Sequence, residues 1–151
     1  MKLYLVTTPD GMPVAWCLAD PKIGEREVAA ALLDCAARAG ALRPGLILIG
    51  DKGFAGREFE NLVTSGFGLQ FVRPDRRDEA ARHGSIGWIR QWIESVNDTL
   101  KGQLDLERHG GRTTERLYAR IAQRLLALAV CVWHNWTAGA SVRRSLIQYD
   151  H

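Results

Sequence analysis

A short, wholly apolar run between two groups of turn-forming residues constrains the fold more than any other feature of the chain. Leu46 to Ile49 (LILI) follows residues 44–45 (PG) and precedes residues 50–53 (GDKG). A run of this length without alternating polar residues is typical of a parallel strand that is buried on both faces. Parallel strands are joined by crossover connections, usually helices, so the run predicts an α/β fold with Asp51 at the tip of a strand.

Segments on both sides of this run predict the order of the other elements. Two strand-like runs, Lys2 to Thr8 and Met12 to Leu18, flank a turn at residues 9–11 (PDG) and predict a β-hairpin. The first of these runs lacks clean alternation, which indicates a strand with neighbours on both sides. Spaced apolar residues then predict a helix over Glu25–Ala39, a short helix over about Arg57–Ser65 and a strand over Leu69–Arg73.

The C-terminal half predicts two long helices after an exposed, charged connection over residues 74–85. The first helix, Ile86–Leu106, has apolar residues at i, i+4, i+7 and i+11, namely Ile89, Ile93, Val96 and Leu100. The second runs from Thr114 to about Trp136 and is separated from the first by two glycines, Gly110 and Gly111. The whole order predicts a mixed sheet, made of a hairpin and parallel strands, with two long C-terminal helices.

Size and composition favour a single domain over residues 1–151. A chain of 151 residues can bury about 68–70% of the surface that its unfolded form exposes, which is enough for a core. A content of 46% hydrophobic and 25% charged residues excludes a disordered or fibrous chain. The three cysteines have no paired spacing, so they predict neither a disulfide framework nor a zinc ribbon, and they fit the reducing cytoplasm. The most apolar stretch, Leu125 to Trp133, is far shorter than the roughly 20 residues of a membrane span.

Positive charge is concentrated in the C-terminal half. Residues 1–75 hold eight Lys and Arg against nine Asp and Glu, whereas residues 76–151 hold twelve against eight. All but one of these twelve cations are arginines, and Arg suits bidentate recognition of phosphate. A polyanionic partner is one interpretation, and simple solvation of the surface by arginine is the other.

One face of the first long helix carries a line of polar residues. Arg90, Glu94, Asn97 and Lys101 repeat the spacing of the apolar stripe, displaced by one residue. A carboxylate between cations, together with Asp51 at the end of a strand, suits phosphoryl transfer with a bound metal ion, because carboxylates hold Mg²⁺ and cations hold phosphates. Periodicity alone favours the alternative, a solvated face with an Arg90 to Glu94 ion pair.

Three motifs together resemble the DDE transposases of bacterial insertion sequences. They are LILIGDKGF at residues 46–54, the R-x3-E-x6-K spacing within IRQWIESVNDTLK at 89–101, and ERHGGRT at 107–113. The closing HNW, RRSL and YDH segments are also similar to this family, so the resemblance covers nearly the whole chain. Asp51 matches the second acidic ligand of the family, and Glu94 the third. Arg90 and Lys101 match the arginine and lysine of its signature.

The resemblance implies a ribonuclease-H-like fold and metal-dependent cleavage and transfer of DNA strands during transposition. Asp51 and Glu94 would be the catalytic residues and the ligands of Mg²⁺ or Mn²⁺ in a two-metal site. DNA, as transposon ends and target, would be the partner, with no membrane involved and a homodimer left open. Arg90, Asn97 and Lys101 would contact DNA.

The chain departs from the family pattern at two places. Gly87 occupies the position of the signature tyrosine, with Trp88 and Trp92 nearby. The first catalytic Asp of the family lies on a strand before the hairpin, and neither Asp10 nor Asp20 fits that position. We therefore expect a partial catalytic domain whose first catalytic strand is missing, with an incomplete metal site and little or no DNA cleavage. Whether it is an enzyme is left open.

A series of arginines at four-residue steps is a further candidate for DNA binding. It comprises Arg108, Arg112, Arg116, Arg120 and Arg124, and a helix would arrange it as a slowly winding ridge. Such a ridge can follow phosphates without reading sequence. The alternative is pairing with Glu107, Glu115 and carboxylates of the preceding helix.

The remaining candidates favour structural roles. We expect His109 in a loop, His134 at the edge of the core, and Trp133 and Trp136 closing the core instead of stacking on bases. Cys131 is expected to be a buried small hydrophobe.

Two other functions compete with a catalytic fragment. One is a remnant that only binds DNA or dimerises. The other is a receiver-like α/β domain that is phosphorylated at Asp51, which the opening hairpin disfavours.

Overall fold

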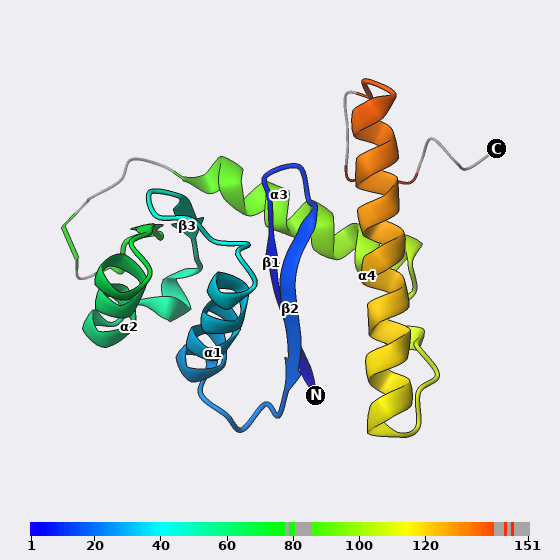
Figure 1. Ribbon diagram of the computed structural model, residues 1–151, viewed down its shortest axis with the longest axis horizontal. Helices are drawn as coiled ribbons and strands as arrows, with labels where there is room; N and C mark the ends of the chain where they lie inside the picture. Colours follow the sequence, from blue (N-terminus) through cyan, green and yellow to red (C-terminus); the bar gives the residue numbers. More distant parts are fainter. Residues whose placement is uncertain (78, 81–85, 141–143, 145, 147–151) are drawn as a thin grey trace. The chain divides into compact units, whose positions relative to one another are not determined.

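The computed structural model describes residues 1–77, 79–80, 86–140, 144 and 146, with the backbone alone at 87–90. The chain divides into two compact units (Figure 1). The first unit comprises Met1–Leu5 and Val14–Gly87, and the second comprises Val6–Pro13 and Trp88–His151. The elements are α/β, as the sequence predicts.

The predicted hairpin is confirmed as β1 (Lys2–Thr7) and β2 (Pro13–Ala19). Its turn is closed by hydrogen bonds from Thr8 N–H to the Met12 carbonyl and from Gly11 N–H to the Thr8 carbonyl, both 2.9 Å. Gly11 has a φ of +91°, and a Cβ there would lie 2.9 Å from Cβ of Arg144. The turn therefore requires glycine for its conformation and for the space that it leaves.

The parallel βαβ unit is also confirmed. β3 (Ile47–Ile49) pairs in parallel with β4 (Gln70–Val72), with Ile47 opposite Gln70. The crossover contains α2 (Arg57–Asn61) and a π-helical turn at Leu62–Gly66. Before it, α1 (Glu25–Arg38) packs the buried residues Val28, Leu32, Leu33 and Ala36, and ends before Gly40, which has a φ of +72°.

The prediction that Leu46 to Ile49 is fully buried is wrong. Leu46 is 46% exposed and Ile47 is 59% exposed. Among the described strands β3 has one neighbour, β4, and the hairpin forms a separate two-stranded sheet. The exposed residues of this run therefore lack the cover that further strands of a wider sheet and its helices would supply.

The first long helix is shorter than predicted. α3 spans Gly87–Asp98 and continues as a π-helical turn at Thr99–Gln103. Thr99 Oγ1 lies 3.0 Å from the Ser95 carbonyl oxygen and 2.7 Å from that of Arg144, so its hydroxyl can donate to either. A threonine that bonds the carbonyl four residues back bends a helix, which accounts for the wider turn. In the other π-helical turn, the hydroxyl of Thr64 likewise donates to the Glu60 carbonyl, with 2.8 Å between the two oxygens.

The second long helix is confirmed as α4 (Thr114–Thr137), one continuous rod in Figure 1. Thr113 caps its first turn by accepting a hydrogen bond from Arg116 N–H at 3.4 Å. The core of the second unit consists of buried residues of α3, its π-helical turn and α4: Val96, Leu100, Ile121, Leu125, Leu128 and Val132. Ile93, which the apolar stripe predicts to be buried, is exposed.

Candidate functional site

Asp51 directly follows β3, as the sequence predicts. Gly50 extends the pairing by donating its N–H to the Val72 carbonyl at 3.0 Å. A Cβ at Gly50 would lie 2.9 Å from the ring of Phe71, so this position has no room for a side chain. Asp51 then caps a 3-10 turn (Lys52–Phe54), and its Oδ1 accepts the N–H of Lys52 at 2.6 Å. The carboxylate is exposed and is oriented by its own backbone.

Three phenylalanines fix the position of this turn. The ring centroids of Phe54 and Phe59 are 5.6 Å apart, and those of Phe59 and Phe71 are 5.7 Å apart in an edge-to-face arrangement. Phe54 belongs to the GDKGF motif, Phe59 lies on α2 and Phe71 lies on β4. The aromatic contacts thus connect the turn after Asp51 to both neighbouring elements of the first unit.

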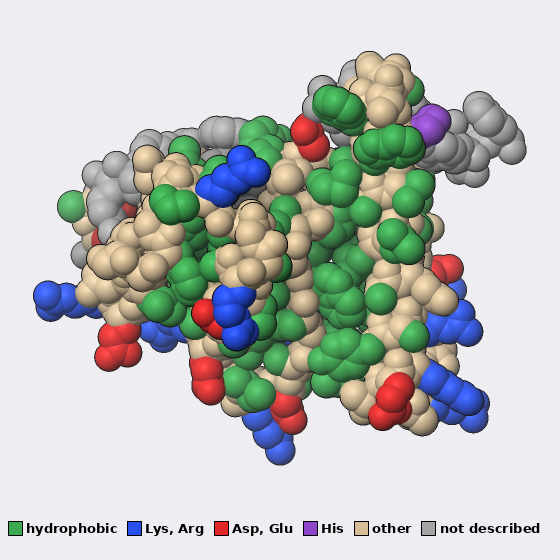
Figure 2. Space-filling model, viewed as in Figure 1, with side chains coloured by type: hydrophobic (Ala, Val, Ile, Leu, Met, Phe, Trp, Pro, Cys, Tyr) green, Lys and Arg blue, Asp and Glu red, His purple; other side chains and the backbone are tan. Residues whose placement is uncertain are grey.

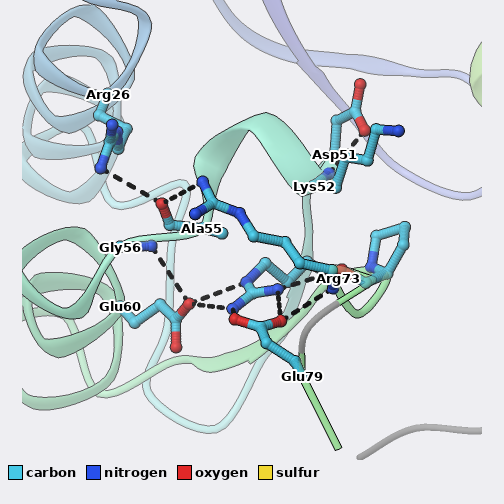
Figure 3. A network of polar contacts seen from close by, with 10 residues as sticks. Arg26, Asp51, Lys52, Ala55, Gly56, Glu60, Arg73 and Glu79 are labelled. Carbon is cyan, nitrogen blue, oxygen red and sulfur yellow. Dashed lines mark hydrogen bonds and ion pairs between the residues drawn. The ribbon is translucent and has the colours of Figure 1, made fainter. Parts of the chain in front are cut away.

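A buried arginine holds the segment beyond β4 (Figure 3). The side chain of Arg73 is 3% exposed and lies between two carboxylates. It donates to Glu60 Oε1 at 2.8 Å from Nε, and its Nη1 and Nη2 reach the two oxygens of Glu79 at 2.7 and 2.8 Å. These hydrogen bonds raise the pKa of Arg73 above its ordinary value, against the effect of its burial.

The sequence patterns did not indicate this network. They predict an exposed connection at residues 74–85, but Glu79 within that segment pairs with a buried side chain. One signal was present in the arginine that ends an apolar strand, because a buried guanidinium requires carboxylate partners. Identifying those partners needs the fold, since Glu60 lies on α2.

The carbonyl oxygen of Ala55 joins the turn to two further arginines. It accepts hydrogen bonds from Arg26 Nη1 of α1 and from Arg76 Nη2, both at 3.2 Å. Glu60 Oε1 also accepts the N–H of Gly56 at 3.3 Å. The loop from Asp51 to Gly56 is therefore held by side chains from both ends of the first unit's sequence.

The polar line predicted on the first long helix lies in the second unit. Glu94 and Asn97 are exposed on α3. The side chain of Arg90 lies outside the described residues. Lys101 lies on the π-helical turn, where the angular position of a residue differs from that in an α-helix, and its Nζ pairs with Glu107 Oε1 at 3.1 Å.

The two candidate metal ligands belong to different units, Asp51 to the first and Glu94 to the second, and each is described within its own unit. Within the described residues there is no group of three or more His, Cys, Asp or Glu side chains arranged to hold a metal ion. The assignment of both residues as ligands stays a prediction.

The arginine series is not one helical ridge. Arg108 lies in a 3-10 turn (Leu106–Arg108) and Arg112 in the loop before α4, so only Arg116, Arg120 and Arg124 lie on the helix. Arg124 is bound to backbone: its Nε donates to the Asp105 carbonyl at 3.1 Å and its Nη1 to the Arg120 carbonyl at 3.1 Å. The expected pairing with Glu107 does not occur among the described contacts of these arginines, because Lys101 takes that carboxylate.

Two other sequence expectations concern loops and the core. His109 lies in a loop, and its Nδ1 accepts the N–H of Gly111 at 3.1 Å, as expected for a structural role. A Cβ at Gly111 would lie 2.9 Å from the backbone of Leu117, so this position has no room for a side chain. This explains why one of the two adjacent glycines is required. Burial raises the pKa of the Cys131 thiol, in keeping with a structural role for this residue.

The prediction that Trp133 and Trp136 close the core is wrong. They are 59% and 58% exposed, and Figure 2 shows hydrophobic side chains at the surface along α4. The buried face of α4 contains Leu125, Leu128 and Val132. Tryptophan spacing alone does not define which helical face meets the core.

Comparison of the chain with protein-family models, curated proteins and solved structures finds no match. In the described residues, none of the helices combines the length and apolar character needed to cross a membrane.

Proposed function

We propose that the chain is a catalytic domain, or part of one, of a DDE-type transposase, which cleaves and transfers DNA strands by metal-dependent phosphoryl transfer. The observation that carries this proposal is the joint presence of G-D-K-G-F after a strand and of R-x3-E-x6-K on a helix. Neither motif alone has the same specificity. The proposed partner is DNA.

The surroundings of Asp51 support its role as a metal ligand. Its carboxylate is exposed, and Oδ1 accepts a hydrogen bond from the Lys52 N–H at 2.6 Å. Mg²⁺ prefers oxygen ligands and retains several waters, so an exposed carboxylate at the carboxyl end of a parallel strand is a suitable ligand.

Glu94 is the proposed second ligand. It is exposed on α3, shortly before the buried residues Val96 and Leu100, which attach this helix to its unit. The carboxylate is thus exposed on a helix whose other face is buried, and a rigid helix can orient it. Arg90, Asn97 and Lys101 are proposed to contact DNA from the same helix and its π-helical turn, and Arg112, Arg116 and Arg120 from the loop before α4 and the start of that helix.

The two small sheets are compatible with a ribonuclease-H-like arrangement. We propose that the hairpin of β1 and β2 and the parallel pair of β3 and β4, which are two separate sheets among the described strands, correspond to the hairpin and the parallel strands of that fold. An isolated two-stranded sheet is marginally stable in water, so both pairs would gain from further strands.

A bound Mg²⁺ or Mn²⁺ would supply activation of a nucleophilic water and stabilisation of the leaving oxygen. Asp51 and Glu94 would hold this ion, and the neighbouring cations would hold the phosphates. Since the resemblance implies three acidic ligands and this chain offers two, we expect weak or no cleavage by the chain alone.

A strand-cleavage assay on labelled DNA tests the proposal. Residual cleavage should require Mg²⁺ or Mn²⁺, cease with EDTA and be lost in Asp51→Ala and Glu94→Ala. Glu58→Ala, which removes an exposed carboxylate of α2, is the matched control and should cleave as the wild type does. Cleavage that is unaffected by Asp51→Ala would contradict the assignment.

A non-catalytic protein that binds DNA or dimerises is the second candidate. The observation that favours it is that the described residues contain no group of three or more metal-ligating side chains. A chain of this kind would bind DNA in EDTA as well as in Mg²⁺, and would not cleave it under either condition.

A further inference from the structure

An open pocket of about 610 Å³ lies beside the turn that follows Asp51 in the first unit. Its lining comprises Lys52, Gly53, Asp75, Arg76 and Arg77. Three of the five residues are cations and one is an anion, so the pocket carries a net positive charge. No sequence pattern indicated it, because the residues of the lining come from two segments separated by the whole βαβ crossover.

The wall that carries the two arginines is fixed by the buried ion pairs of Arg73. Arg76 donates its backbone N–H to Glu79 Oε2 at 2.9 Å, and Glu79 is itself held by both terminal nitrogens of Arg73. Arg76 also donates through Nη2 to the Ala55 carbonyl. The position of the Arg76 guanidinium is therefore set before any ligand arrives, which lowers the entropic cost of binding.

None of the three cations has a carboxylate partner among the described ion pairs. Among the described contacts, neither the ammonium of Lys52 nor the guanidinium of Arg77 has a carboxylate within 4.0 Å. Arg76 uses one nitrogen on a neutral carbonyl, so its charge is not compensated there either. Guanidinium and ammonium groups gathered without an equal number of carboxylates favour a phosphate ligand.

We propose that this pocket binds a backbone phosphate of a DNA strand. The shape favours a strand over a small metabolite, because the pocket is open whereas small-molecule sites bury most of their ligand. Lys52 and Asp51 belong to one turn, so a strand held in the pocket runs beside the candidate metal ligand. The identification of the ligand as DNA rests on the proposed function, whereas the prediction that the pocket binds an anion does not.

Fluorescence anisotropy with a labelled 20-nucleotide single strand tests the proposal on the full chain. The measurement is made in EDTA over a series of salt concentrations, so it does not depend on metal binding or cleavage. The Lys52→Gln/Arg77→Gln double variant should bind several-fold more weakly, and the slope of log K against log salt should fall by about 0.7 for each phosphate that the variant no longer neutralises.

The matched control is Arg43→Gln/Arg57→Gln, which removes two exposed cations of the same unit outside the pocket. Equal reduction of affinity and slope in both double variants would overturn the proposal, since any surface cation would then suffice. An unchanged slope in Lys52→Gln/Arg77→Gln would also overturn it. Circular dichroism melting of each variant confirms that the fold is retained, as we expect from the replacement of surface side chains.

Inorganic phosphate distinguishes the two sources of the anion. At constant ionic strength it should displace the labelled strand only weakly, since it replaces a single contact. Tight binding of phosphate that depends on Arg77, combined with strand binding that does not, would overturn the proposal in favour of a free-anion site. Retained strand binding in the pocket, combined with no Mn²⁺ binding that depends on Asp51 and Glu94, would leave this inference standing and refute the proposed catalytic function.

Discussion

The guanidinium of Arg73 and the carboxylate of Glu79 face each other through two parallel hydrogen bonds, Nη1 to Oε2 at 2.7 Å and Nη2 to Oε1 at 2.8 Å. Arg73 ends the strand region and is buried, whereas Glu79 lies in the charged segment that follows. Glu79 also accepts the backbone N–H of Arg76. The pair thus helps to fix the backbone of Arg76, one of the cations of the pocket.

Replacing Arg73 with alanine should destabilise the chain strongly. The variant leaves Glu60 and Glu79 without their shared partner, and removal of one member of a buried ion pair costs about 3 to 5 kcal/mol. Because both carboxylates are partly exposed, we expect the lower end of this range from urea unfolding. The control is Arg38→Ala, whose pair with Asp34 is exposed and should contribute little to stability. Equal destabilisation in the two variants would contradict the structural role of Arg73.

Glu115 should make the stability of the chain depend on pH in the acidic range. Hydrogen bonds from its own backbone N–H and from Thr113 lower the pKa of its carboxyl below the ordinary 4.5. A lowered folded pKa means stability that is present above the unfolded pKa and is lost as pH falls through the folded pKa. Glu115→Gln should therefore lower Tm at pH 7.

The difference in Tm between Glu115→Gln and the wild type should shrink as pH falls below about 4.5, where the carboxyl of the unfolded state becomes protonated, and should vanish once pH is also below the folded pKa. Thermal melts at pH 7, 4 and 2.5 measure this. A difference that stays constant across the series would show that the carboxylate charge has no part in capping α4.

The three cysteines should differ in reactivity. Cys35 is exposed on α1, whereas Cys17 and Cys131 are half-buried. Burial raises the pKa of the Cys17 and Cys131 thiols, which lowers the fraction of reactive thiolate at a given pH. With Ellman's reagent at pH 8 one thiol should react fast, and Cys35→Ser should remove that phase. Disappearance of the fast phase in Cys131→Ser instead would contradict the burial of this thiol.

Local pattern predicted the elements that depend on local interactions. The hairpin, α1, the crossover to β4 and α4 lie close to their expected positions, because turn residues, glycine caps and helical spacing act over a few residues. The expected end of α3 at Leu106 was wrong, since Thr99 bonds a carbonyl within its helix and faces that of Arg144, which is distant in the sequence.

Contacts between distant segments were not predictable. Arg73, Glu60 and Glu79 carry no shared periodicity, and their association requires the packing of α2 beside β4. The exposure of Ile47 and of Trp133 depends likewise on which faces are covered. For the candidate site, the sequence correctly predicted Asp51 after a strand and Glu94 on a helix. The roles of the site in binding metal and DNA remain predictions.

Titration with Mn²⁺ tests the central claim most directly, because it reports on Asp51 and Glu94 without requiring cleavage. Electron paramagnetic resonance of free Mn²⁺ gives the amount bound by the wild type, Asp51→Asn, Glu94→Gln and the control Glu58→Gln. We predict that the wild type and the control bind Mn²⁺ alike and that both site variants bind it at least about tenfold more weakly. Equal binding by all four proteins, or no binding by the wild type, would contradict a metal site formed by Asp51 and Glu94.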